Sequence, residues 1–185
     1  MRAVGIIGSP RKDGNSAYLT RELLGSLARA FETELIFLSQ LDIHPCNGCH
    51  SCVPDGKCII DDGMQAVHAT LKDASVVILS SPVYMGGITS RLRLFMERAW
   101  PLRTGSLKGK ICSYLVLGRR DLGVAVAEME EFFSRIGAVQ LPGIIGYGYN
   151  EGDIQQDAEA MRNTVRLAND ILELSSKLFK SPDDD

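Results

Sequence analysis

Hydrophobic and polar positions follow two different periods along this chain. Short apolar runs of the kind that form buried strands alternate with longer segments in which apolar residues recur every three or four positions, as on one face of a helix. The apolar runs span residues 3–7, 34–38, 75–80, 111–117 and 139–147. The helical stripes include Leu19, Leu23, Leu27 and Phe31 after the first run, Met64, Val67, Leu71 and Ala74 after the second, Leu92, Phe95, Met96 and Ala99 after the third, Val126, Met129, Phe133 and Ile136 after the fourth, and Met161, Val165, Ala168 and Leu172 after the fifth.

Strands that alternate with helices favour an α/β fold. Right-handed crossovers between parallel strands place helices on both faces of the sheet, so the pattern predicts a three-layer, doubly wound, five-stranded parallel sheet. The run at Val139–Tyr147 is the least regular, because Pro142 and Gly143 interrupt it and favour a bulge or an edge position. We expect residues 1–179 to form a single domain and residues 180–185 to form a polar tail.

Composition and charge exclude several classes of protein. The 185 residues are 45% hydrophobic and 23% charged, which is typical of a globular protein and excludes a disordered or fibrous chain. Twenty basic and 23 acidic residues give a net charge of −3, without a basic stripe, so we do not expect a nucleic-acid partner. We expect no membrane span and no secretion signal, because neither a long apolar run nor a signal-like amino terminus is present. The expected location is cytoplasmic.

The loop after the first strand has the character of an anion site. It runs from Gly8 to Ser16 and leads into a helix, whose first backbone N–H groups and dipole favour a phosphate. Its pattern is neither the dinucleotide G-x-G-x-x-G nor a Walker A motif, which argues against an ATPase. The alternative is an ordinary turn in which Asn15 or Ser16 caps the helix. In the same way, Asp62 is expected to cap the helix that begins near Met64.

The loop after the third strand can provide a wall for a planar heterocycle. Tyr84 and Met85 stand there between Pro82 and a pair of glycines, so the segment offers an aromatic face together with backbone polar groups. The alternative is an ordinary turn with Tyr84 packed on the surface.

Four of the five cysteines are clustered in one connection between a strand and a helix. Cys46, Cys49, Cys52 and Cys58 lie within an insertion at residues 45–60, which is longer than such connections usually are. Three cysteines at intervals of three, with a fourth after a turn, suit a 4Fe-4S cluster. The alternatives are metal-free thiols on a lid or subunit contact, a zinc site or a disulfide.

The remaining thiol and imidazole groups carry less information. Cys112 stands alone inside a strand and is expected to be a small buried hydrophobe. His50 could donate to a cluster sulfur, but a solvated loop histidine is the simpler interpretation. His44 and His68 are assigned no role.

Taken together, the two loops and the cysteine segment resemble the NAD(P)H-dependent FMN reductase superfamily, which has the flavodoxin-like fold. The resemblance extends from Met1 to about Ile145, and the cysteine spacing is most similar to that of the iron-sulfur flavoprotein branch. It implies that the FMN phosphate is held by Ser9, Arg11, Asn15 and Ser16. It also implies that the isoalloxazine ring is bordered by Pro82, Val83, Tyr84, Met85 and Gly86, and that the cluster ligands are Cys46, Cys49, Cys52 and Cys58.

The chain departs from the family pattern after the fourth strand. A glycine-rich loop is common there, whereas this chain has Arg119, Arg120, Asp121 and Leu122 between Gly118 and Gly123. Whether these residues contact the flavin or a second subunit, or simply form surface ion pairs, stays open at the level of the sequence.

The resemblance implies an FMN-dependent oxidoreductase in which the flavin carries the chemistry and no acid–base side chain is needed. Electrons would pass between a ferredoxin-like or NAD(P)H donor and a small oxidant or quinone, through FMN and the cluster, in a homodimer or homotetramer. The alternatives are a cluster-free NAD(P)H-dependent FMN or quinone reductase, a non-enzymatic flavodoxin-like electron carrier, and a sensor of phosphate ligands.

Overall fold

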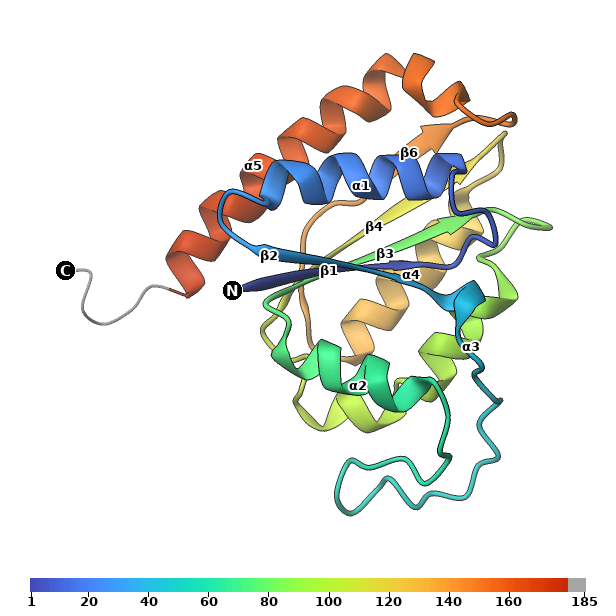
Figure 1. The fold of residues 1–185 in the computed structure, drawn as a ribbon, viewed down its shortest axis with the longest axis vertical. Helices are drawn as coiled ribbons and strands as arrows, with labels where there is room; N and C mark the ends of the chain where they lie inside the picture. Colours follow the sequence, from blue (N-terminus) through green and yellow to red (C-terminus); the bar gives the residue numbers. More distant parts are fainter. Residues whose placement is uncertain (180–185) are drawn as a thin grey trace.

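A single parallel sheet with helices on both faces forms the protein in the computed structural model, which describes residues 1–179 (Figure 1). The expected polar tail, Lys180–Asp185, lies outside the described residues. The strands are β1 (Arg2–Ile7), β2 (Glu32–Phe37), β3 (Val76–Pro82), β4 (Ile111–Gly118), β5 (Val139–Gln140) and β6 (Ile144–Tyr147). The α-helices are α1 (Asn15–Leu27), α2 (Met64–Asp73), α3 (Ser90–Arg98), α4 (Gly123–Arg135) and α5 (Ala158–Leu178), and short 3-10 turns are η1 (Leu38–Gln40), η2 (Trp100–Thr104) and η3 (Asp153–Gln156).

The strand order is β2-β1-β3-β4-β5, and β6 also pairs with β4. Every pairing is parallel, and Val4 of β1 lies opposite Glu34 of β2 on one side and Val77 of β3 on the other. The order reverses beside β1, which is where a doubly wound sheet binds ligands. The predicted α/β fold is therefore confirmed.

Two apolar cores hold the helices on the sheet. Helices α1 and α5 cover one face over a core that includes Leu19, Leu23 and Ile171, while α2, α3 and α4 cover the other over a core that includes Phe95 and Phe133 (Figure 1). These five side chains are fully buried, so each contributes about 1.5–3 kcal/mol of hydrophobic stabilisation. The first four helical stripes read from the sequence pack in these cores. The fifth is only partly correct, because Val165 is exposed and the buried face of α5 includes Leu167 and Ile171 as well as the expected Ala168.

The irregular fifth strand is split into two pieces. β5 and β6 both pair with β4. Leu141 still donates to the carbonyl of Cys112 at 2.9 Å, so only Pro142 and Gly143 leave the ladder. Ser113 Oγ donates to the carbonyl of Pro142 at 3.1 Å, and a Cβ on Gly143 would lie only 2.1 Å from the ring of Tyr114. The predicted interruption is confirmed: it separates β5 from β6, and Gly143 leaves room there for the ring of Tyr114.

All the strands point the same way, so the loops that follow β1, β3, β4 and β6 meet at one edge of the sheet. The connection from η1 to α2 leaves the same edge but extends beyond α2, away from the sheet (Figure 1). Among the helices of residues 1–179, none combines the length and apolar character needed to cross a bilayer.

Candidate functional site

A cavity of about 270 Å³ opens at the carboxyl edge of the sheet. It brings together loops that are far apart in the sequence. It is lined by Ser9, Arg11, Gly14, Asn15, Ser16, Pro82, Val83, Tyr84, Leu117, Gly118, Arg119, Gly148 and Tyr149. Of the residues expected to border a cofactor, Met85 and Gly86 do not line the cavity, while the others do. Its size and edge position suit a small-molecule ligand.

The start of α1 presents its first turn to this cavity without a side-chain cap. Gly14 is the N-cap residue, and no side-chain hydrogen bond closes the first turn. The alternative in which Asn15 or Ser16 caps the helix is therefore wrong. The Asn15 amide instead accepts from the backbone N–H of Gly152 at 3.0 Å and donates to the carbonyl of Asn150 at 2.8 Å. An uncapped helix N-terminus leaves backbone donors available to an anion.

Two positive charges border the cavity. Arg11 and Arg119 both line it, and no acidic side chain of residues 1–179 does so. The guanidinium carbon of Arg119 lies 5.6 Å from the centroid of the Tyr149 ring, which is a cation–π contact. Arg120 instead forms an exposed pair with Asp121 at 3.9 Å. Arg119 therefore lies at the cavity, whereas Arg120 forms a surface ion pair.

Buried hydroxyl groups connect the loops after β1 and β3. Ser81 Oγ accepts from the backbone N–H of Thr89 at 3.0 Å and donates to the carbonyl of Pro82 at 2.9 Å. Thr89 Oγ1 donates to the carbonyl of Gly8 at 3.0 Å, and it also accepts from the N–H of Leu92 to cap α3. Both hydroxyl side chains belong to buried residues, so water competes poorly for these bonds and the two walls of the cavity keep a fixed spacing.

The tip of the loop after β3 is a tight hairpin turn. Tyr84 and Gly87 exchange backbone hydrogen bonds of 3.0 and 3.2 Å, and the two residues between them, Met85 and Gly86, have φ values of 51° and 86°. Positive φ at both central positions is the geometry of a type I′ turn, which places a fully exposed Met85 at the tip. Tyr84 lines the cavity, so this turn contributes one aromatic side chain to the cavity wall.

Gly118, Gly148 and Tyr149 are among the lining residues that sequence reasoning did not assign to the site, and they lie at or just beyond the carboxyl ends of β4 and β6. A Cβ on Gly118 would lie 2.6 Å from Leu122 Cδ2, and one on Gly148 would lie 2.7 Å from Asn15 Nδ2, so a larger residue at either position would displace a neighbouring side chain. Tyr149 follows Gly148 directly. The only sequence signal was the position of these residues immediately after strands.

The cysteine segment has a different character. Its four thiols are free; Cys46 and Cys49 are exposed, and Cys52 and Cys58 are half-buried. Burial, followed by charge repulsion from the other three thiols, raises the pKa of Cys52, whereas a hydrogen bond with Ser51 lowers the pKa of Cys49. Four soft thiol donors on one loop match the chemistry of an iron-sulfur site. However, no three Cys, His, Asp or Glu side chains of residues 1–179 converge to hold a metal ion.

Cys112 behaves as expected for a packing residue. It is fully buried in β4, and burial raises the pKa of its thiol to about 12. A thiol that stays protonated is neither a metal ligand nor a nucleophile.

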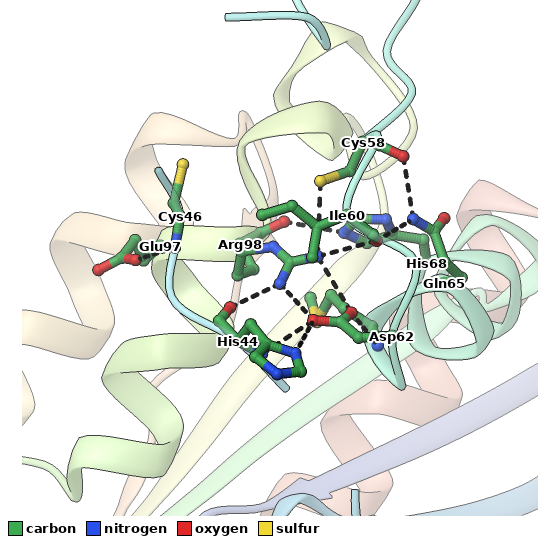
Figure 2. A network of polar contacts seen from close by, with 10 residues as sticks. His44, Cys46, Cys58, Ile60, Asp62, Gln65, His68, Glu97 and Arg98 are labelled. Atoms are coloured by element: carbon green, nitrogen blue, oxygen red, sulfur yellow. Dashed lines mark hydrogen bonds and ion pairs between the residues drawn. The ribbon is translucent and has the colours of Figure 1, made fainter. Parts of the chain in front are cut away.

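A buried ion pair stands at the base of the cysteine segment (Figure 2). Arg98 and Asp62 have side chains that are each 1% exposed, and their two shortest N–O distances are 2.6 and 3.1 Å. The Arg98 guanidinium also donates to the carbonyl of His44 at 2.6 Å and to the sulfur of Cys58 at 3.5 Å. One cation therefore contacts both arms of the segment.

The carboxylate of Asp62 completes this base. It accepts from the backbone N–H of His44 at 2.8 Å and from that of Met64 at 2.9 Å. Burial opposes its ionisation, but the hydrogen bonds from Arg98 and from these two backbone groups prevail and lower the pKa of Asp62 to about 2. The expected cap is thus only partly correct: Gly63 occupies the N-cap position of α2, and Asp62 serves the ion pair as well.

Neighbouring side chains support the same base (Figure 2). Glu97 accepts from the backbone N–H of Cys46 at 2.6 Å, and Gln65 donates to the carbonyl of Cys58 at 2.9 Å. The buried His68 ring donates to the carbonyl of Arg98 at 2.8 Å, and burial lowers its pKa. His68, to which the sequence assigned no role, therefore helps to hold the last turn of α3.

Comparison with known proteins agrees with this geometry. Residues 1–150 match the family model of NADPH-dependent FMN reductase. An iron-sulfur flavoprotein of Methanocaldococcus jannaschii is 33% identical, over 96% of this chain and 100% of the relative, and one of Archaeoglobus fulgidus is 31% identical, over 100% and 86%.

Several solved structures have folds similar to that of this chain. The Trp repressor binding protein from Bacillus subtilis superposes with a TM-score of 0.68 at 20% identity, over 90% of this chain and 98% of that one. An NADH:FMN oxidoreductase in its apo form gives a TM-score of 0.66 at 17% identity, over 98% and 91%. Together with the family match, these findings place the chain in the NADPH-dependent FMN reductase family, among its iron-sulfur flavoproteins, as an FMN-dependent oxidoreductase with the flavodoxin-like fold.

Proposed function

We propose that the cavity binds FMN with its phosphate at the start of α1 and its ring against the loop after β3. Ser9, Arg11, Asn15 and Ser16 would serve the phosphate. The uncapped helix N-terminus and the charge of Arg11 support this assignment. Because the Asn15 side chain already bonds Asn150 and Gly152, its part would be to fix the loop and to offer its backbone N–H.

The ring would lie along Pro82, Val83 and Tyr84, with Met85 and Gly86 forming the turn that carries Tyr84. Half of the Tyr84 surface is exposed beside the cavity, and a flat heterocycle could cover it. Tyr149 and Arg119 stand at the same cavity and would limit the access of water to the ligand.

We propose further that Cys46, Cys49, Cys52 and Cys58 hold a 4Fe-4S cluster. The donor set and the names of the relatives support this assignment. When bound, FMN supplies one- and two-electron chemistry, and the cluster supplies one-electron transfer. The protein would thus connect a ferredoxin-like or NAD(P)H donor to a small oxidant or quinone in the cytoplasm.

Assembly is part of the same proposal. The cysteine segment extends away from the sheet edge that carries the cavity of its own chain (Figure 1). A homodimer or homotetramer would allow the segment of one chain to approach the flavin cavity of another.

The observation that carries the proposal is the meeting of four loops in one positively charged cavity, with the cysteine segment leaving the same sheet edge. Anaerobic purification followed by flavin, iron and sulfide analysis tests it. We expect about one FMN and about four irons and four sulfides per chain. Replacing the four loop cysteines by serine should remove the iron but not the FMN, whereas Cys112→Ser should retain both.

A cluster-free NAD(P)H-dependent FMN or quinone reductase is the second candidate. It is favoured by the separation of the thiols, since no three metal-binding side chains converge among the described residues. FMN without iron, together with oxidation of NAD(P)H in the presence of a quinone, would establish this candidate. FMN without turnover of NAD(P)H or reduced ferredoxin would indicate an electron carrier, and failure to take up FMN would overturn the whole proposal.

A further inference from the structure

The last turn of α3 contacts both arms of the cysteine segment. Glu97 binds the backbone of Cys46 on the incoming arm, and Arg98 binds the carbonyl of His44 on the same arm. On the returning arm, Arg98 contacts the sulfur of Cys58 and the carbonyl of Ile60, each at 3.5 Å. The first and fourth cysteines are therefore fixed relative to the same helix (Figure 2).

Arg98 differs from an ordinary surface arginine in its burial. Its side chain is 1% exposed, and its charge is balanced directly by Asp62, whose side chain is equally buried. The buried Nε of Arg98 has no hydrogen-bond partner among the described side chains, so it is the Nη2 group that contacts the sulfur of Cys58. A buried charge acts on its neighbours through a lower dielectric than a surface charge does, so its effect on an adjacent sulfur is large.

We propose that Arg98 is a positioning residue that holds Cys58 as the fourth cluster ligand and tunes the cluster through a charged hydrogen bond to its sulfur. The inference rests on the proposed function, because it takes Cys58 to be a ligand. Hydrogen bonds to cluster sulfurs and nearby net charge set the reduction potential of iron-sulfur centres. A guanidinium beside the ligand favours the form that has gained an electron, and so it raises the potential. The carboxylate of Asp62 acts in the opposite direction.

The two partners of the ion pair thus predict shifts of opposite sign. Removal of the positive charge in Arg98→Met makes the potential more negative, and removal of the negative charge in Asp62→Asn makes it more positive. If the pair served only to hold the segment together, breaking it from either side would have the same kind of effect. The sign of the shift therefore separates electrostatic tuning from a purely structural role.

The experiment is a dithionite titration of anaerobically purified protein, followed by optical and electron paramagnetic resonance spectra of the iron centre. The variants are Arg98→Met, Arg98→Lys and Asp62→Asn. Arg2→Met is the matched control, because Arg2 forms a partly exposed pair with Glu32 far from the cysteines. We expect Arg2→Met to retain the wild-type reduction potential. We expect the potential of Arg98→Lys to lie closer to the wild-type value than that of Arg98→Met.

Each outcome decides the inference. Opposite shifts in Arg98→Met and Asp62→Asn, with rescue by lysine, support it. A cluster in Arg98→Met with unchanged potential and spectrum overturns it and leaves Arg98 as a structural clamp. If Arg98→Met does not fold or load iron, the positive shift in Asp62→Asn decides, and its absence overturns the inference. Wild-type protein without iron refutes the proposed cluster itself, a failure seen before any variant is compared.

Discussion

The cavity and the cysteine segment lie at the same sheet edge but are organised in opposite ways. The cavity is built from short loops whose backbones are fixed by strand ends, close glycine contacts and buried hydroxyl groups. The cysteine segment has no helix or strand between η1 and α2, and its order depends on contacts at its base. One region takes its shape from sheet geometry, whereas the other depends on side-chain contacts around a buried ion pair.

The largest effect should come from breaking that ion pair. Asp62→Asn leaves the Arg98 charge buried without its partner, and we expect a loss of about 3 kcal/mol in the free energy of unfolding. Urea denaturation of the apoprotein measures it. Glu173→Gln, which breaks the exposed pair with Lys177, should cost far less, because water screens an exposed pair. Equal losses of unfolding free energy in the two variants would show that the buried pair is no more stabilising than the exposed pair.

The Asp62 carboxylate should also make the stability of the protein depend on pH in the acidic range. The pKa of Asp62 falls from an ordinary value of 3.8 to about 2 in the folded chain, so its contribution to stability is complete above about pH 4. That contribution is lost as the pH falls through about 2. The difference in unfolding free energy between wild type and Asp62→Asn should therefore shrink between pH 4 and 2. A difference that stays constant over this range would contradict the assignment.

On the cavity side, the largest effect should come from Ser9→Asp. A carboxylate at this buried position would repel the FMN phosphate, and like charges in contact cost several kcal/mol, so we expect affinity to fall on the order of 100-fold or more. Quenching of flavin fluorescence on titration with apoprotein measures the dissociation constant. Ser26→Asp adds the same charge on an exposed face of α1 and should change the affinity less than about twofold. Unchanged affinity in Ser9→Asp would place the phosphate elsewhere.

A smaller effect is expected from Gly118→Ala. The new Cβ would lie 2.6 Å from Leu122 Cδ2 and 3.1 Å from Val83 Cβ, so it must displace the cavity wall at a cost of about 1–3 kcal/mol. The melting temperature in thermal unfolding and the FMN affinity in flavin titration should both fall. Gly123→Ala, in open space at the start of α4, should be neutral or stabilising. Identical behaviour of the two variants would show that the wall tolerates displacement.

The smallest effect should come from the rim of the cavity. Arg119→Ala removes an exposed cation–π contact with Tyr149, which is worth about 0.5–1 kcal/mol, so FMN affinity should fall by no more than about fivefold. Arg120→Ala, which breaks only the exposed pair with Asp121, should leave the affinity unchanged. A larger loss in Arg120→Ala than in Arg119→Ala would reverse the assignment of the two arginines.

The sequence predicted the sheet, because its evidence is distributed over many residues. Every strand and helix contributes its own period, and a single exception such as Pro142 and Gly143 changes one strand without changing the order of the others. The loops after β1 and β3 were also within reach, since parallel strands bring their carboxyl ends to one edge.

The missed features depend on contacts between residues that are distant in the chain. Asn15 was expected at the phosphate, with a helix cap as the alternative, but its side chain binds a loop 135 positions away. Asp62 was expected to act only as a cap, since nothing local indicates its pairing with Arg98. One signal was present: Arg98 stands three residues after Phe95 on the buried stripe of α3, where a charged residue needs a partner.

The bonds that join Ser81, Thr89 and Gly8 have a consequence for the thermodynamics of ligand uptake. They fix the distance between the loops after β1 and β3, which would hold the phosphate and the ring in the proposed complex. A preorganised receptor loses little conformational entropy when its ligand arrives. Association with the flavin should thus proceed without reordering of these backbones, and most of the contact free energy should appear as affinity.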